Sequence, residues 1–160
     1  IVPMGVSGAC IIKQQNNEYV VFAKRSKNMF LAPGKIELVP SGVIDTRCIL
    51  EKNNIDYKEN LIHEFEEEVK LNKHVIDKVE GWYIIRDEIV KSCDICGIIY
   101  LNCDKDSIIE GIKKSHEYEQ AIIIDKVDLK NYIDENKDNM IRTTYYFANK
   151  ILDGVYSARK

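Results

Sequence analysis

The sequence lacks internal repeats, low-complexity tracts and proline- or serine-rich linkers. We therefore see no domain boundary and expect one domain, residues 1–160, which is long enough to build a hydrophobic core. No apolar run approaches the roughly 18 residues of a membrane span, so we expect no membrane partner. The net charge is only −3, which predicts no general attraction to nucleic acid. The chain begins with Ile1 rather than Met, so we expect it to be trimmed, and a preceding targeting segment stays open.

The cysteines do not form the pattern of a disulfide framework. There are five of them at uneven spacing, which favours reduced thiols and a reducing compartment such as the cytoplasm. Cys93 and Cys96 form a CxxC pair, but they lie in a stretch typical of a long strand. Residues three apart on a strand point to opposite faces, so this pair cannot easily share a metal ion.

The order of the expected elements is typical of a mixed α/β protein. Antiparallel hairpins come first, and helices concentrate toward the end, which indicates an α/β layered sandwich. We expect strands at 5–14, 18–25, 36–40, 79–87, 89–103 and 120–125, and helices at 56–70, 126–135 and 138–153.

The helix predicted at 56–70 carries an unusual concentration of glutamates. Its start is marked by a capping box of Asp56 and Glu59. At 100° per residue, the buried stripe is formed by Leu61, Ile62, Phe65 and Val69. A second arc, centred roughly 120° away, is formed by Glu64, Glu67 and Glu68. Glu66 falls on the far side of the apolar stripe and is expected to be an ordinary surface residue.

Two interpretations of this patch compete. Most charge runs are solvated helix faces, which is the simpler interpretation. Lys70 and Lys73 offer some compensation, but the three carboxylates have no good lysine partners four residues away on their own arc. A divalent cation explains the cluster better, because Mg²⁺ and Mn²⁺ take oxygen ligands from one or two carboxylates, waters and substrate phosphates. The spacing ExxEE alone does not decide between them.

The surrounding sequence resembles the Nudix hydrolase family, whose signature is G-x5-E-x7-R-E-U-x-E-E-x-G-U, with U a bulky aliphatic residue. The end of this signature is similar to "HEFEEEVKL" at 63–71, and its start to "PGKIELVPSG", with Gly42 as the opening glycine. Upstream, "VVFAKRS" looks like the second strand of the family, and "SHEYEQAIIID" resembles a segment that often carries one more acidic residue. The likeness covers roughly residues 5–135 and implies a Nudix-like α/β/α sandwich with a mixed β-sheet.

The spacing within the signature departs from the family. Glu64 lies 22 residues after Gly42, seven more than the fifteen that the signature allows. We therefore expect residues 43–55 to form an enlarged loop over or beside the cleft. The first glutamate of the signature has no clear counterpart, because its place holds Cys48 when counted forward and Ile55 when counted backward.

Two substitutions affect the helix itself. His63 stands in place of the arginine that, in the family, helps to orient the catalytic carboxylates, and it lacks the fixed charge and fork of arginine. Lys70 stands in place of the glycine that ends the helix. Reduced activity, or none, is therefore an open alternative.

The resemblance implies a site for Mg²⁺ or Mn²⁺, whose ligands would be the carboxylates of Glu64, Glu67 and Glu68 and the backbone carbonyl of Ser41. A further carboxylate would serve as ligand or general base, with Glu117 as first choice and Glu119 as second. Alternation along the strand turns only one of Lys24 and Arg25 inward, and we favour Arg25 as the residue that binds substrate phosphates.

The function that follows is metal-dependent cleavage of the diphosphate bridge in a nucleoside diphosphate linked to another moiety. The expected partner is thus a nucleotide-like small molecule, and the oligomeric state stays open. One alternative is a catalytically impaired Nudix-fold module that only binds nucleotides. Another is an enzyme similar to isopentenyl-diphosphate isomerase, for which Cys48 would be the candidate catalytic cysteine.

Overall fold

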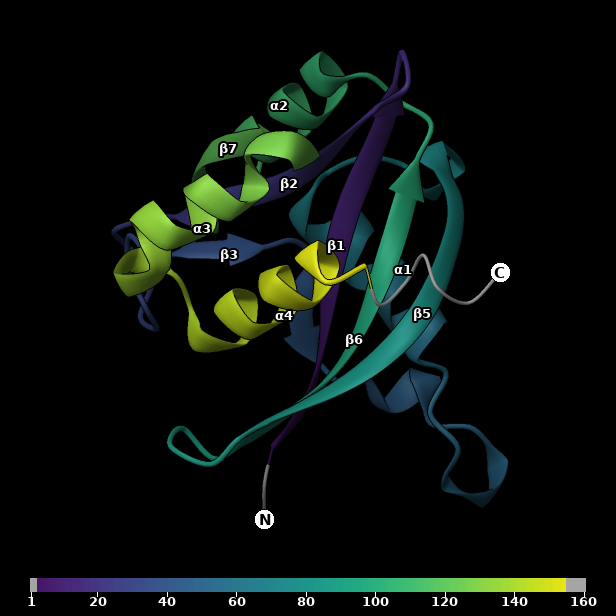
Figure 1. Ribbon diagram of the computed structural model, residues 1–160. Helices are drawn as coiled ribbons and strands as arrows, with labels where there is room; N and C mark the ends of the chain where they lie inside the picture. The colour runs from purple at the N-terminus through teal and green to yellow at the C-terminus, as the bar shows by residue number, and fades with distance from the viewer. Residues whose placement is uncertain (1–2, 155–160) are drawn as a thin grey trace.

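One mixed sheet forms the centre of the structure (Figure 1). The computed structural model describes residues 3–154, without the side chains of Asn53 and Trp82. Within this range the strands are β1 (Met4–Gln14), β2 (Asn17–Arg25), β3 (Ile36–Leu38), β4 (Ser41–Val43), β5 (Ile76–Asp87), β6 (Ser92–Leu101) and β7 (Tyr118–Asp125). Their order is β3-β2-β1-β6-β5, with β4 paired to β1 and β7 paired to β2. Strands β1 and β6 are parallel, and the other pairs are antiparallel.

Helices cover both faces of this sheet. They are α1 (Tyr57–Glu68), α2 (Lys105–Lys113), α3 (Leu129–Asn136) and α4 (Arg142–Leu152). Alternation along β2 shows how the two layers arise, because Phe22 packs with α3 and α4 while Val21 and Ala23 pack with α1 and α2. The predicted α/β/α sandwich with a mixed sheet is therefore confirmed. In the described part of the chain, no helix is long and apolar enough to cross a membrane.

Helix α1 forms where its local signals predict it. The side chain of Asp56 accepts a hydrogen bond of 3.0 Å from the backbone N–H of Glu59, which is the expected N-cap. The buried side of the helix includes Leu61 and Phe65. After the last helical turn, Lys70 has a φ of 60°, so this lysine occupies the left-handed conformation in which the family places glycine.

The structure corrects two predictions of secondary structure. Residues 105–113 form α2, which was not predicted, although Asp104 caps it by accepting a hydrogen bond of 2.8 Å from the N–H of Ser107. The strand predicted at 89–103 begins only at Ser92, because residues 88–91 form a turn. The carboxylate of Asp87 fixes this turn by accepting hydrogen bonds from the next backbone N–H groups.

The expanded segment 43–55 contains two short 3₁₀ turns rather than a featureless loop. Its beginning is fixed by Asn60 of α1, whose side chain donates to the carbonyl of Val43 and accepts from the N–H of Asp45 at 2.6 Å. Its tip projects at the lower right of Figure 1, away from α4. Cys48 is only 2% exposed, and like the other four cysteines it is free.

Candidate active site

The glutamates of α1 meet the sheet at the turn into β4. The backbone N–H of Ser41 donates a hydrogen bond of 2.9 Å to Oε2 of Glu68. At Gly42, the carboxyl atoms of Glu64 lie within 3.0 Å of the place where a Cβ would be. A side chain at this position would therefore displace the Glu64 carboxylate, so the glycine allows helix and turn to approach this closely.

A buried polar network extends from Glu68 into the sheet. The hydroxyl of Tyr118 lies 3.0 Å from Oε2 of Glu68 and also contacts Oε1 of Glu37. Arg25 donates from Nη1 to Glu37 at 3.0 Å and from Nε to the carbonyl of Leu31 at 3.1 Å. Because a phenol has one hydrogen, Tyr118 can donate to only one of the two carboxylates at a time. The network thus gathers two carboxylates around one hydroxyl in a site with little access to water.

The electrostatics of this cluster are unfavourable to negative charge. Burial, together with the neighbouring Glu67, raises the pKa of Glu64 to about 7. Burial and the charge of Glu37 raise the pKa of Glu68 well above its ordinary value. The pKa of Glu37 is raised by burial in spite of the adjacent Arg25. Among residues 3–154, no three acidic, histidine or cysteine side chains are grouped closely enough to form a ready metal site.

The structure separates the two candidates for the additional carboxylate. The charge of Glu117 contributes to the raised pKa values of Glu37, Glu64 and Glu68, so Glu117 lies close enough to act on the cluster. Glu119 instead forms an ion pair with Lys24 at 3.1 Å. The geometry thus favours Glu117 over Glu119, while the role of either residue stays a prediction.

The other predicted residues occupy different positions around the cluster. Arg25 is turned inward, as predicted, but its guanidinium already pairs with Glu37, so phosphate binding by Arg25 stays a prediction. Glu67 is exposed beside Glu64. His63 pairs with Glu59 at 3.4 Å.

The prediction from sequence missed Glu37 and Tyr118. Glu37 is the one acidic residue in the short apolar strand β3, and it is 4% exposed. A buried charge requires a partner, and the end of β2 supplies Arg25. The isolated glutamate in "IELVP" was therefore a usable signal, whereas the contact with Tyr118, which lies 81 residues further on, was not visible in the sequence.

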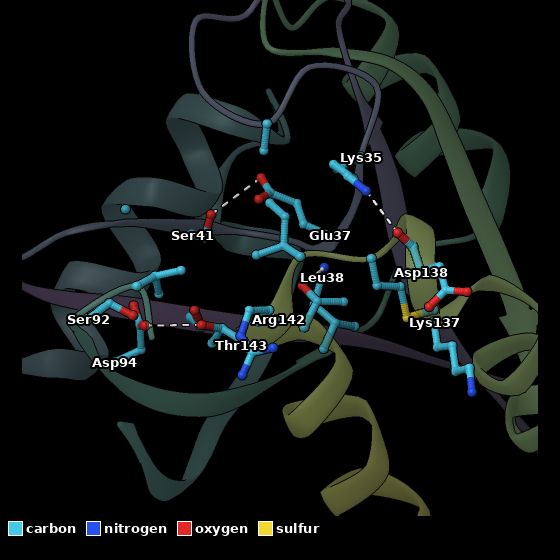
Figure 2. A pocket seen from close by; sticks show the side chains of 17 residues that line it. Lys35, Glu37, Leu38, Ser41, Ser92, Asp94, Lys137, Asp138, Arg142 and Thr143 are labelled. Carbon is cyan, nitrogen blue, oxygen red and sulfur yellow. Dashed lines mark hydrogen bonds between the residues drawn. The ribbon is translucent and has the colours of Figure 1, made fainter. Parts of the chain in front are cut away.

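A pocket of about 680 Å³ opens beside this cluster (Figure 2). Glu37, Ser41 and Gly42 line one part of it. Figure 2 shows Ser92 and Asp94 on one side of the pocket and Lys137 and Asp138 on the opposite side. The volume is typical of a small-molecule site. Cys48 does not line the pocket, and neither do the other residues of 43–55 whose side chains the structure describes.

The layered sheet, the glutamate-bearing helix and the glycine turn beside it together define a Nudix fold. No protein-family model matches the sequence, and no curated protein sequence matches it either. Solved structures, in contrast, match this chain by their fold. A MutT/Nudix family protein from Listeria innocua has a TM-score of 0.67 at 12% identity, covering 98% of this chain and 95% of the other.

Two further structures have the same fold. The Ap4A hydrolase of C. elegans, solved as a binary complex, has a TM-score of 0.65 at 14% identity and covers 98% of this chain and 99% of its own. The Nudix domain of Shewanella oneidensis NrtR, solved with ADP ribose, has a TM-score of 0.53 at 15% identity, with 82% and 77% covered. At these identities the likeness establishes the fold, and the chemistry must be argued from the site.

Proposed function

We propose that this chain is a metal-dependent Nudix-type hydrolase that cleaves the diphosphate bridge of a nucleoside diphosphate linked to another moiety. One observation carries the proposal: the carboxylates of Glu64 and Glu68 meet the turn at Ser41 and Gly42, and this turn lines a pocket of about 680 Å³. The phosphates of a nucleotide in this pocket would lie beside the carboxylates. The Ap4A hydrolase with the same fold agrees with this assignment.

The donor chemistry of the site suits a hard divalent cation, although no three of its described carboxylates are grouped as closely as in a formed metal site. Arg25 compensates Glu37, but among the described residues neither Glu64 nor Glu68 forms an ion pair. Two carboxylates in a partly buried site therefore have uncompensated charge, and all candidate ligands are oxygens, which Mg²⁺ and Mn²⁺ prefer. The ligands in this proposal are Glu64, Glu67, Glu68 and the carbonyl of Ser41, with Glu117 as a further ligand where it does not act as the general base. When bound, such an ion offsets phosphate charge and lowers the pKa of bound water.

The protein's own groups position the reaction. The N–H of Ser41 and the hydroxyl of Tyr118 both contact Oε2 of Glu68 and fix its orientation. Glu117 is the proposed general base, which accepts a proton from the attacking water as that water forms a bond to phosphorus and the bridging P–O bond breaks. Glu119 remains the second choice. Arg25 is proposed to bind phosphate, for which it would have to share its guanidinium with Glu37.

A panel of nucleotides tests the proposal. With Mg²⁺ or Mn²⁺, at least one nucleoside diphosphate derivative should be cleaved into two phosphate-bearing products, and in ¹⁸O-labelled water one of these should carry the label. Glu68→Gln should lower kcat by at least about 10²-fold, a loss of roughly 2.7 kcal/mol in transition-state stabilisation. Glu66→Gln is the matched control, because the side chain of Glu66 lies away from the cluster and accepts a hydrogen bond from the backbone N–H of Lys73. Tight binding without turnover of any nucleotide would refute the hydrolase.

The second candidate is a module that binds a nucleotide without hydrolysing it. It is favoured by His63, which pairs with Glu59 and so does not orient the catalytic carboxylates as an arginine would. A Nudix domain in complex with ADP ribose supports it as well. The isomerase-like alternative has no such support, because Cys48 is buried outside the pocket.

A cytoplasmic location remains part of the proposal, and it rests on the cysteine content.

A further inference from the structure

A second, smaller pocket of about 260 Å³ adjoins the pocket of the candidate active site. Tyr145 and Tyr146 of α4 are among the residues that line it. The two pockets have four lining residues in common, namely Lys137, Asp138, Met140 and Arg142. They therefore form one continuous space, of which the proposed function uses only the part at the turn of Ser41 and Gly42.

The smaller pocket lies at the end of the larger one that is away from this turn. Figure 2 shows Lys137 and Asp138, which line both pockets, on the opposite side from Ser41. Lys35, which donates to the carbonyl of Asp138 at 2.8 Å, precedes Ser41 by only six residues. Because six residues span at most about 20 Å, a ligand whose phosphates occupy the turn can extend into the smaller pocket.

Two carboxylates of the larger pocket lie at its opposite ends. Asp94 belongs to the phosphate end, since a Cβ built on Gly5 would lie 2.5 Å from Oδ1 of Asp94 and 2.8 Å from the carbonyl oxygen of Gly42. It is therefore not placed to contact a base. Asp138 belongs to the far end, where its side chain is exposed. An exposed carboxylate exchanges water for a ligand with little net gain, so Asp138 is not expected to be the main contact there.

Tyr146 contributes an aromatic ring of fixed orientation to the smaller pocket. The residue is 41% exposed, yet its hydroxyl accepts a hydrogen bond of 3.1 Å from Nη2 of Arg142. The guanidinium of Arg142 also lies 5.6 Å from the ring centroid, and Asp87 holds Arg142 at 2.6 Å. Tyr145 packs edge-on against the ring, with 5.6 Å between the centroids. A ring that is both accessible and held in place can stack on a planar ligand with little loss of side-chain freedom.

We infer that the smaller pocket binds the base of the nucleotide and that Tyr146 is the residue on which this base stacks. The inference rests on the proposed function for the position of the phosphates, but its test needs only binding. Every nucleobase has an aromatic face, so stacking favours a nucleotide over a diphosphate without a base and distinguishes only weakly among the bases.

Calorimetry with Mg²⁺ and adenosine diphosphate, uridine diphosphate or ribose 5-diphosphate tests this inference. Ribose 5-diphosphate lacks only the base, so the wild type should bind it roughly tenfold or more weakly than the nucleotides. Tyr146→Leu should remove most of this difference by weakening the nucleotides alone, whereas Tyr146→Phe, which keeps the ring, should bind as the wild type does. Asp138→Asn should weaken adenosine diphosphate less than Tyr146→Leu. Phe30→Leu is the matched control, because Phe30 is 96% exposed but lines neither pocket.

The outcomes separate this inference from the proposed function. The role of Tyr146 is overturned if Tyr146→Leu binds the nucleotides as tightly as the wild type, or if it weakens ribose 5-diphosphate to the same extent. A larger effect of Asp138→Asn or Phe30→Leu, or no binding of any nucleotide, would overturn it as well. A loss confined to the nucleotides, in a protein that hydrolyses none of them, would support Tyr146 and refute the hydrolase. Hydrolysis with the same KM in the wild type and Tyr146→Leu would do the reverse.

Discussion

Replacing Gly42 by alanine should lower kcat strongly while leaving the fold intact. The added methyl group would overlap the carboxyl atoms of Glu64, which lie within 3.0 Å of its position. Ordinary contact at a Cβ begins at 3.4 Å, so the carboxylate must move. Gly42 is not among the residues with positive φ, and alanine can therefore adopt its backbone conformation without strain.

The expected magnitudes follow from which atoms have to move. The Glu64 carboxylate ends a flexible side chain, and it should shift by roughly 1 Å, a misplacement that can lower kcat about 10²-fold, or roughly 2.7 kcal/mol. The stability should change by less than about 1 kcal/mol, because the loss of contact is offset by the smaller entropy of the unfolded alanine chain.

Gly111→Ala is the matched control. Its methyl group would meet the backbone carbonyl of Val69, which cannot rotate away, so this variant should lose about 1–3 kcal/mol of stability with little change in kcat. Nucleotide turnover with Mg²⁺ and thermal unfolding, measured on both variants, provide the comparison. If Gly42→Ala retains wild-type kcat with an unchanged melting temperature, then the position of the Glu64 carboxylate is unimportant and the proposed site is wrong.

Three further predictions concern the same region. Mg²⁺ at about 100 times its Kd should stabilise the protein against thermal unfolding by about 2.7 kcal/mol. Glu68→Gln should remove this stabilisation and Glu66→Gln should preserve it, whereas an equal response in both variants would indicate a solvated acidic face. Tyr118→Phe, which loses the contact with Glu68, should lower kcat more than it raises KM. The control Tyr57→Phe loses a hydrogen bond to the carbonyl of Gly81 and should cost only about 1 kcal/mol of stability. If the two variants had the same kcat and KM, Tyr118 would not position the carboxylate. Lys70→Gly should raise the free energy of unfolding in denaturant by about 0.5–1 kcal/mol, because glycine adopts the positive φ of this position without strain. A loss of stability would show that contacts of the lysine side chain compensate for the backbone strain.

The elements predicted correctly are those with local signals. Helix α1 carries its own N-cap at Asp56 and a clear apolar stripe, so neither its start nor its glutamate face depends on distant residues. The turn at 88–91 was missed because Ile89 and Val90 are β-branched apolar residues typical of a strand, although both are exposed. The chain reverses there because the carboxylate of Asp87 accepts hydrogen bonds from the backbone N–H groups of these two residues, and Arg142 also donates to Asp87.

The residues of the candidate site fall into the same two groups, those with a local signal in the sequence and those without one. The spacing of the glutamates, which brings Glu64 and Glu68 to one side of α1, can be read from a helical wheel. Tyr118 lies on β7 and Asp94 on β6, and only the sheet places these two strands on opposite sides of the β1–β2 pair. A single sequence contains no signal for such non-local pairing.

This non-local part of the site holds Glu68 although His63 stands where the Nudix signature has an arginine. Without that arginine, Glu68 needs another group to hold its carboxylate, and His63 cannot supply it because it pairs with Glu59. Tyr118 and the N–H of Ser41 contact the same oxygen of Glu68 from the sheet side. A neutral hydroxyl does not offset the charge of an ionised carboxylate, whereas an arginine would neutralise it. The site therefore keeps its carboxylates oriented yet uncompensated, which is the state in which they have most to gain from binding a divalent cation.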